Sequence, residues 1–320
     1  MADPILQVND LTMYYLTRQG EVKAVDGVTF DIARGQTLGL VGESGCGKTS
    51  VAISLMRLLP DNARLIRGHV FLDGRDLISM SEDEVRRYRW KRIAMVFQAA
   101  MNALDPVYRV GDQIIEAIEA HDTDGTRAKA RERVAELFRM VGLDPRLMER
   151  YPHEYSGGMR QRAVIAMALA CEPDIIIADE PTTALDVIVQ DRILREMKEI
   201  RRELNMSMLY ITHDIGVVAE VTDRIGVMYA GKLVELGDTL EVFQNPIHPY
   251  TAALMSAFPS ILGEKRPLAT LPGEPPNLID PPQGCRFHPR CPRVTEVCRH
   301  EEPPMVNRGD HWAACWNPLG

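Results

Sequence analysis

The stretch Gly42-Glu43-Ser44-Gly45-Cys46-Gly47-Lys48-Thr49 decides the fold of this chain. It follows an apolar run at 37–41, typical of a buried strand, and it precedes a segment with helical spacing of its apolar residues. A glycine-rich loop of this spacing between a strand and a helix is typical of a phosphate-binding loop. Its glycines let backbone N–H groups turn toward phosphate oxygens at the positive end of the helix dipole. The sequence therefore predicts a nucleotide site here.

The side chains of this loop extend the prediction. Lys48 brings a positive charge to the outer phosphates, and the hydroxyl of Thr49 is suited to Mg²⁺. We predict that the nucleotide is bound by Gly42, Ser44, Gly45, Cys46, Gly47, Lys48, Thr49 and Ser50.

The composition is that of an acidic globular protein. The chain has 320 residues, of which 45% are hydrophobic and 26% charged, and its formal net charge is −8. This content is enough to bury an ordinary core, and the acidic balance disfavours nucleic acid as a partner. No apolar stretch approaches the length of a membrane span, and residues 1–4 are not those of a secretion signal. We therefore expect the chain on the cytoplasmic side of the membrane.

The order of the patterns along the chain predicts its organisation. Apolar residues at 5–33 alternate as in a small antiparallel sheet, whereas residues 99–170 have mainly helical spacing. Prolines are frequent from residue 246 onward. The expected fold class is α/β: a phosphate-loop (RecA-like) core with an antiparallel β subdomain, an inserted helical subdomain and an irregular C-terminal extension. We place the nucleotide-binding domain at 1–245 and the extension at 246–320.

A second anion-binding helix start is predicted at Ser156-Gly157-Gly158. Ser156 is a good N-cap for the helix that runs through the apolar segment 163–170. The two glycines expose backbone N–H groups where the helix begins. The sequence thus contains two phosphate-binding helix starts.

Polar residues follow several of the predicted strands. Asp179 and Glu180 end the apolar run at 175–178, and ligands gather at the carboxyl ends of such buried parallel strands. We predict that Asp179 holds Mg²⁺ and that Glu180 orients or deprotonates an attacking water. Gln98 and His213 also follow predicted strands, and His213 is placed to contact a phosphate.

Four of the six cysteines lie near the C-terminus, with the spacing C-x5-C-x6-C-x16-C. Clustered cysteines in a reducing compartment suggest a metal site rather than disulfides. Zinc ribbons usually have paired C-x2-C knuckles, which are missing here, and four thiolates also suit an iron–sulfur cluster. The spacing alone leaves zinc, a cluster and unligated thiols open. These residues are Cys285, Cys291, Cys298 and Cys315.

The ordered set of motifs resembles the ATPase subunit of an ABC transporter. It consists of VGESGCGKT at 41–49, Gln98, YSGGMRQR at 155–162, IIIADEP at 175–181, TALD at 183–186 and His213. The Ser-Gly-Gly run is the most specific of these. The segments 245–250 and 284–292 resemble the C-terminal extension of the oligopeptide/dipeptide importer ATPases.

The resemblance implies roles for individual residues. Two ATPase subunits of this family pack head to tail, and each ATP lies between the phosphate loop of one and the Ser-Gly-Gly segment of the other. Ser156, Gly157 and Gly158 would therefore bind the nucleotide of the second subunit. The remaining implied roles are adenine stacking by Tyr15, Mg²⁺ contact and sensing of the membrane subunit by Gln98, general base catalysis by Glu180, interface contact by Asp186 and γ-phosphate contact by His213.

The resemblance also implies a function and partners. The chain would hydrolyse ATP to energise uptake of peptides or related solutes, as a peripheral protein at the cytoplasmic face of the membrane. Its partners would be a second homologous ATPase in a heterodimer, two transmembrane permease subunits and an extracytoplasmic solute-binding protein. The four C-terminal cysteines would hold a [4Fe–4S] cluster. The alternative, a soluble ABC-type ATPase of translation or DNA repair, is disfavoured by the single motif set and the acidic charge.

Overall fold

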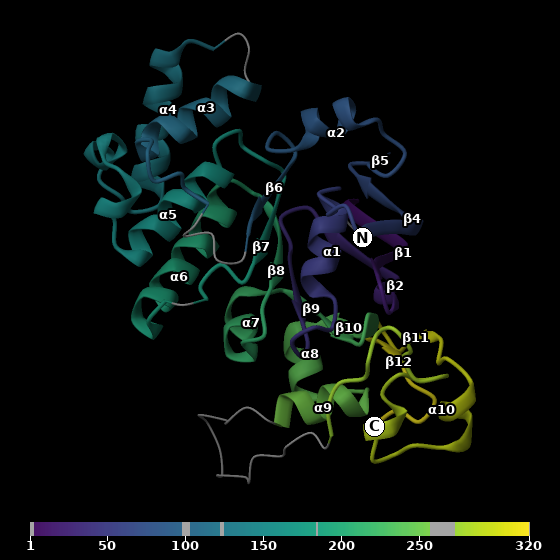
Figure 1. Ribbon diagram of the computed structural model, residues 1–320. Helices are drawn as coiled ribbons and strands as arrows, with labels where there is room; N and C mark the ends of the chain where they lie inside the picture. The colour runs from purple at the N-terminus through teal and green to yellow at the C-terminus, as the bar shows by residue number, and fades with distance from the viewer. Residues whose placement is uncertain (1–2, 98–102, 122–124, 184, 257–272, 320) are drawn as a thin grey trace. The chain divides into compact units, whose positions relative to one another are not determined.

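The computed structural model describes residues 3–97, 103–121, 125–183, 185–256 and 273–319 (Figure 1). The chain divides into two compact units. The phosphate-loop unit comprises Leu6–Ile32, Gln36–Ser79 and Tyr210–Gly320, and the helical unit comprises Met1–Ile5, Ala33–Gly35 and Met80–Leu209. The predicted site residue Gln98 lies outside the described residues.

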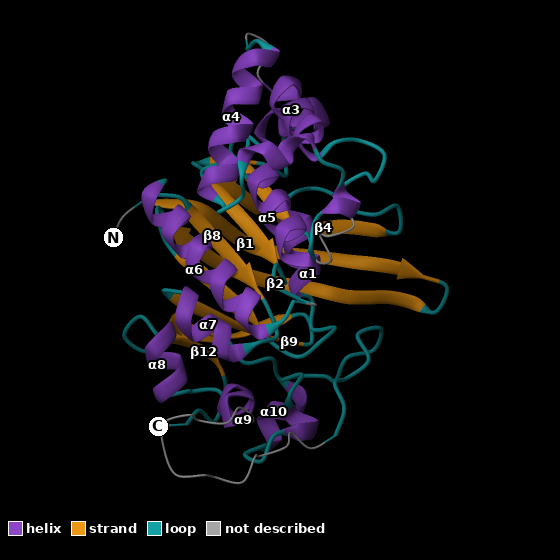
Figure 2. Ribbon diagram, turned by 90° about the vertical axis from the view of Figure 1, so that its left-hand side faces the viewer, coloured by secondary structure: helices purple, strands orange, loops and turns teal. Residues whose placement is uncertain are grey.

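One antiparallel sheet has the strand order β2-β1-β4-β5. Its strands β1 and β2 precede the phosphate loop in sequence, and β4 and β5 follow it. Its long strands β1 (Pro4–Thr17) and β2 (Gly20–Ala33) run side by side (Figure 2), and the sheet is completed by β4 (Ala63–Leu72) and β5 (Arg75–Asp76). Asp73 and Gly74, with φ of 51° and 75°, join β4 to β5. Positive φ at both residues is what a tight two-residue hairpin turn requires.

The core sheet of the phosphate-loop unit has the order β11-β12-β10-β9-β3. The strands are β3 (Thr37–Val41), β9 (Arg224–Tyr229), β10 (Lys232–Asp238), β11 (Met305–Asn307) and β12 (Trp312–Ala314). β3 and β9 are parallel, and every residue of β3 is buried. The helices of this unit are α1 (Lys48–Leu55), α7 (Ile215–Val221), α8 (Thr239–Gln244), α9 (Pro249–Ser256), η4 (His288–Arg290) and α10 (Glu296–His300).

The C-terminal extension contributes to this core. Its strand β12 pairs antiparallel with β10, so the end of the chain lengthens the core sheet. Tyr250 and Phe287 pack with Tyr229 of β9, and the three ring centroids lie 4.6, 5.2 and 5.3 Å apart. Buried aromatic rings supply much apolar area. The extension, expected to be irregular, therefore carries short regular elements and shares the hydrophobic core that includes Val41.

The helical unit contains the strands β6 (Ile93–Val96) and β7 (Ile175–Asp179), which are parallel. The next strand in the order β8-β7-β6 is β8 (Ser207–Ile211), which crosses into the other unit. The buried residues of α4 and α6 recur with the 3.6-residue period of a helix, so each helix has one buried face. The helices are α2 (Glu82–Tyr88), α3 (Val110–His121), α4 (Arg127–Met140), η2 (Pro145–Glu149), η3 (Pro152–Glu154), α5 (Gly157–Ala168) and α6 (Val187–Glu203).

Within the described residues, no helix has both the length and the apolar character needed to cross a membrane.

Candidate nucleotide-binding site

The phosphate loop requires glycine at two positions, because its backbone there lies very close to the backbone of other segments. Gly42 and Gly47 have φ of 150° and 108°. A Cβ on Gly42 would lie 2.2 Å from the carbonyl oxygen of Met228, and one on Gly47 would lie 2.0 Å from that of Ala24. Both distances are far below van der Waals contact, so the loop is packed directly against neighbouring backbone and only glycine fits.

Lys48 brings its ammonium group into the loop. The side chain is buried, and Nζ donates hydrogen bonds to the carbonyl oxygens of Gly42 (2.8 Å) and Glu43 (3.1 Å). The positive charge thus lies where the loop begins, next to the start of α1, which favours anions. By contrast, the crest of the loop and the residue after Lys48 are exposed, namely Ser44, Gly45 and Thr49.

Cys46 is a packed residue of the loop. It is buried, and burial raises the pKa of its thiol. Its N–H donates to the carbonyl of Glu43 (3.2 Å), and its own carbonyl accepts from the N–H of Gly231 (2.9 Å). Cys46 therefore holds the loop against the turn between β9 and β10 through its backbone, and its predicted contact with nucleotide stays a prediction.

Tyr15 and Tyr14 point to different partners. The hydroxyl of Tyr15 lies 3.1 Å from the Oγ of Ser50 in the first turn of α1. The hydroxyl of Tyr14 instead donates to Asp26 (3.1 Å). The structure thus places Tyr15, the predicted adenine-stacking residue, beside the helix that follows the loop.

His213 follows β8 near the strand that leads into the loop. The N–H of Thr212 donates to the carbonyl of Leu40 in β3 (3.3 Å), so the chain leaves β8 beside the carboxyl end of β3. His213 is exposed there. Asp214 caps α7 and accepts from the N–H groups of Gly216 and Val217. The phosphate contact of His213 stays a prediction, but its position at this strand end fits it.

The two predicted carboxylate residues lie at the carboxyl end of β7, as expected. Asp179 is the last residue of the strand and is buried. Glu180 has φ of 48°, in the left-handed region that side chains rarely adopt, and its carboxylate accepts from the hydroxyl of Thr183 (3.0 Å). Unfavourable backbone of this kind tends to occur at functional sites. It turns the chain sharply at the residue predicted to be the general base.

The predicted second anion site is a capped helix start in the helical unit. Ser156 caps α5, and its Oγ accepts from the N–H of Met159 (3.3 Å). A Cβ on Gly158 would lie 2.7 Å from Val189 of α6, so glycine permits the close packing of α5 and α6. Asp186 caps α6 by accepting from the N–H of Val189 (3.0 Å). Each of these residues thus has a structural role beside its predicted role in nucleotide binding.

Tyr155 directly precedes this cap. Its side chain is buried, and its hydroxyl donates to the carbonyl of Leu147 in η2 (2.6 Å). Burial raises the pKa of this phenol well above its usual range. The buried tyrosine therefore ties the segment before Ser156 to η2 by one hydrogen bond.

The contacts of Glu43 in the phosphate loop were not predicted from the sequence. Its carboxylate accepts from both terminal nitrogens of Arg290 (2.7 and 3.0 Å), and its N–H donates to the hydroxyl of Tyr250 (3.0 Å). Arg290 is 247 positions away in sequence. The only available signal was that the tail segments 245–250 and 284–292, noted for their resemblance, contain Tyr250 and Arg290.

The four C-terminal cysteines lie close enough to one another for their charges to interact. Burial, with smaller contributions from the other three, raises the pKa of Cys285 to about 12. The N–H of Cys285 donates to the carbonyl of Cys298 (2.9 Å), and the Sγ of Cys298 lies 3.1 Å from the hydroxyl of Thr295. However, among the described residues no group of three or more His, Cys, Asp or Glu could hold a metal ion. This geometry does not support the predicted [4Fe–4S] ligand set of Cys285, Cys291, Cys298 and Cys315.

Two known families match this chain, one before the end of the predicted nucleotide-binding domain and one across that end. The family described as "ABC transporter" matches residues 25–183. The family described as "Oligopeptide/dipeptide transporter, C-terminal region" matches residues 234–298.

Full-length relatives are similar over nearly the whole chain. The Dipeptide transport ATP-binding protein DppD of Bacillus subtilis is 46% identical, over 98% of this chain and 95% of that protein. The Oligopeptide transport ATP-binding protein OppD of Salmonella typhimurium is 43% identical, over 99% and 95%. DppD of Caldanaerobacter subterraneus is 41% identical, over 97% and 96%.

Solved structures are similar in fold. The ATP-binding cassette MJ0796, in a dimeric post-hydrolysis state bound to ADP and Pi, is 27% identical with a TM-score of 0.65, over 73% of this chain and 98% of that one. The cbiO1 protein of Clostridium perfringens, part of the transporter complex cbiONQ, has the same identity and TM-score, over 76% and 92%. These likenesses confirm the predicted α/β fold class with its phosphate-loop core.

Proposed function

Since this chain belongs to the ABC transporter family and is an ATPase of it, we propose that it energises the import of peptides. The observation that carries the peptide assignment is the C-terminal extension, because residues 234–298 match the region described for oligopeptide/dipeptide transporters. The three relatives compared above are named for dipeptide or oligopeptide transport. None of these three is named for translation or DNA repair, so nothing here favours the alternative function.

The ATP site is proposed to form between two ATPase subunits. This chain would supply the phosphate loop to one nucleotide and the start of α5, with Ser156, to the other. Support comes from the N-terminal start of α6, next to its cap Asp186, where the side chains of Val187 and Ile188 are 80% and 82% exposed. Apolar side chains this exposed are suited to burial against another protein. The second subunit is proposed to be a homologous ATPase, giving a heterodimer.

The other proposed partners are two transmembrane permease subunits and an extracytoplasmic solute-binding protein. The chain would then be peripheral, at the cytoplasmic face of the membrane. In this assembly, ATP binding closes the two ATPase subunits on each other and hydrolysis reopens them. Gln98 is proposed to sense the permease, and peptides rather than oligosaccharides or metal chelates are the proposed solute.

Within the site, each residue is proposed to act on a distinct part of MgATP. Lys48 neutralises the outer phosphates, and Thr49, Asp179 and Gln98 would hold Mg²⁺, which supplies charge stabilisation to the transferred phosphoryl group. Oxygen ligands of these types suit Mg²⁺. Glu180 accepts a proton from the attacking water, while Tyr15 stacks on the adenine and His213 contacts the γ-phosphate. Asp186 contacts the second subunit.

The test is the Glu180→Gln variant in the assembled transporter. Glutamine keeps the size of the side chain and removes the base, so ATP should still bind while turnover falls on the order of 10²-fold or more. Peptide uptake into proteoliposomes containing the permease and the binding protein should fall with it. Hydrolysis near the wild-type rate by this variant would exclude the proposed base, and ATP hydrolysis that never responds to the peptide-loaded binding protein would exclude the transport role.

The [4Fe–4S] cluster at the C-terminal cysteines stays a prediction. The closeness of the four thiols supports it, and the lack of a ligand geometry among the described residues stands against it. Iron and sulfide analysis of anaerobically purified protein, with zinc measured in the same sample, decides the question. About four irons and four sulfides per chain would establish the cluster. Zinc without iron, or no metal, would refute it.

A further inference from the structure

The C-terminal extension contacts the phosphate loop at Glu43. Arg290 approaches it from η4 and forms the two-bonded pair described above, with its side chain only 6% exposed and that of Glu43 23% exposed. Arg290 also donates to the hydroxyl of Tyr229 (3.3 Å), and its guanidinium lies 5.8 Å from the centre of that ring. A two-bonded arginine–carboxylate pair fixes orientation as well as distance. Arg290 therefore determines where the side chain of Glu43 points.

Tyr250 fixes the backbone at the same residue. Its hydroxyl accepts the N–H of Glu43, while its ring is fully buried between Tyr229 and Phe287. A hydroxyl on a buried ring cannot move far, so it sets the plane of the peptide between Gly42 and Glu43. The carbonyl oxygen of Glu43 itself accepts a hydrogen bond from Nζ of Lys48. The orientation of Glu43 is thus coupled to the position of the phosphate-binding ammonium group.

The extension is itself anchored by a buried carboxylate. Glu235 of β10 has no exposed surface and accepts from the N–H groups of Ile247 (2.8 Å) and His248 (2.7 Å) and from Nε2 of His311 (2.7 Å). The N–H of Tyr250 then donates to Nδ1 of His248 (3.0 Å). A chain of hydrogen bonds therefore leads from the core sheet to Tyr250, and from Tyr250 to the phosphate loop.

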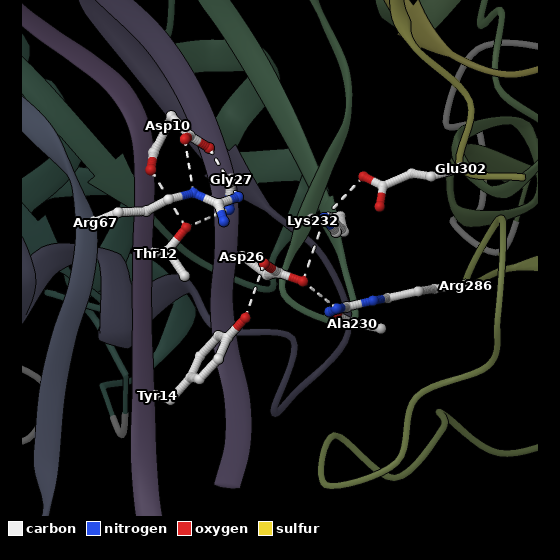
Figure 3. Close-up of polar contacts among 10 residues, drawn as sticks. All are labelled: Asp10, Thr12, Tyr14, Asp26, Gly27, Arg67, Ala230, Lys232, Arg286 and Glu302. Atoms are coloured by element: carbon white, nitrogen blue, oxygen red, sulfur yellow. Dashed lines mark hydrogen bonds and ion pairs between the residues drawn. The ribbon is translucent and has the colours of Figure 1, made fainter.

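A second set of contacts reaches the loop indirectly, through the turn between β9 and β10. Asp26 of β2 interacts with Tyr14, Lys232 and Arg286, as Figure 3 shows. Arg286 also donates to the carbonyl of Ala230 (2.5 Å), in the turn whose Gly231 donates to the carbonyl of Cys46. Arg286 and Arg290 are four residues apart in the extension, so one short segment binds Glu43 directly and binds the turn that contacts Cys46.

We propose that the C-terminal extension holds the phosphate loop in its nucleotide-binding shape through Glu43, and that Arg290 and Tyr250 are positioning residues for ATP. They act through Glu43 and the loop, without a contact of their own to the substrate being required. The inference rests on the proposed binding of ATP at this loop. The inference goes further because it makes ATP affinity depend on the extension as well as on the loop.

The test is MgATP binding to the full chain, followed with a fluorescent ATP analogue and by the thermal shift that ATP produces. Tyr250→Phe keeps the buried ring and removes only the acceptor, so affinity should fall about threefold, as for loss of one hydrogen bond. Arg290→Ala should lower affinity about tenfold because it leaves a half-buried carboxylate unpaired. Arg290→Lys keeps the charge and should recover part of this loss. The matched control is Glu296→Gln, which removes an exposed ion pair to Arg299 within α10 of the extension and should bind ATP as wild type.

A double-mutant cycle separates positioning from general destabilisation. If Arg290 acts through Glu43, then Arg290→Ala should have little further effect on ATP affinity in a Glu43→Gln background. In the assembled ATPase, the variants should raise KM for ATP and leave kcat nearly unchanged. Wild-type affinity in folded Tyr250→Phe and Arg290→Ala proteins, or additive effects of Glu43→Gln and Arg290→Ala, would overturn the inference alone. Failure of the wild-type chain to bind MgATP would overturn the proposed function with it.

Discussion

The phosphate loop and the C-terminal extension reach order by opposite means. The loop at 42–49 is determined locally, because glycines at fixed spacing permit its backbone and a strand and a helix flank it. The extension has few residues in regular elements and depends on contacts with residues far away in sequence. Glu235 binds His311, which is 76 positions away in sequence, and Arg290 binds Glu43, which is 247 positions away. A locally encoded site can thus rely on a distant segment for its final geometry.

The largest effect is expected from Glu235→Ala, which tests whether the extension depends on its buried anchor. The variant removes the acceptor for three donors, two of them backbone N–H groups. Unsatisfied buried donors should cost about 4 kcal/mol of stability. Amide exchange in α9 and β12 should accelerate strongly, while α5 of the helical unit should exchange as in wild type. Equal protection of α9 and β12 in both proteins would show that the anchor is dispensable.

A somewhat smaller effect is expected in the loop, from Gly47→Ala. The added methyl meets the carbonyl of Ala24, and the backbone must keep a left-handed φ. Together these should cost about 3 kcal/mol in urea unfolding. Gly45→Ala is the matched control: it has a positive φ of 78° but no atom within 4 Å of a Cβ, so only about 1 kcal/mol is expected. Similar losses for the two would mean that packing does not decide the glycine at 47.

A third effect is a pH dependence confined to the extension. Burial lowers the pKa of His248 from its ordinary 6.5 to about 4. The unfolded chain therefore binds a proton on this residue between about pH 6.5 and 4 that the folded chain excludes, and the free energy of unfolding falls as the pH falls through that window. We expect a loss of about 2 kcal/mol between pH 7 and pH 5.

The measurement for this prediction is protease sensitivity of the extension at the two pH values, with His248→Gln as the control. The variant has no titrating group here, so it should lose this part of the pH dependence even if it is less stable overall. An equally steep pH dependence in His248→Gln would assign the effect to other groups.

Local patterns predicted much of the fold. The apolar run at 37–41 predicted β3, and the run at 175–178 with its carboxylate end predicted β7. The Ser156 cap was also predicted correctly, because an N-cap and the helix that follows it are encoded within a few residues.

The contacts of the extension could not be predicted in this way. No periodicity or spacing links Glu43 to Arg290, or Glu235 to His311, since these pairs form only when the core sheet brings distant segments together. The cysteine spacing likewise left the metal question open, because ligand geometry depends on the folding of the whole extension. Glu180, in contrast, was placed correctly at the strand end, but its left-handed backbone was not foreseeable from a single residue.

The most direct test of the link between the two regions is amide hydrogen exchange at Glu43 in wild type and in Tyr250→Phe. The N–H of Glu43 donates to the hydroxyl that this variant removes, whereas the N–H of Val51 in α1 donates to Gly47 and serves as an internal reference. We predict that exchange at Glu43 becomes about fivefold faster in the variant, as for loss of about 1 kcal/mol, with Val51 unchanged. Equal exchange at Glu43 in the two proteins would contradict the claim that the extension holds the phosphate loop.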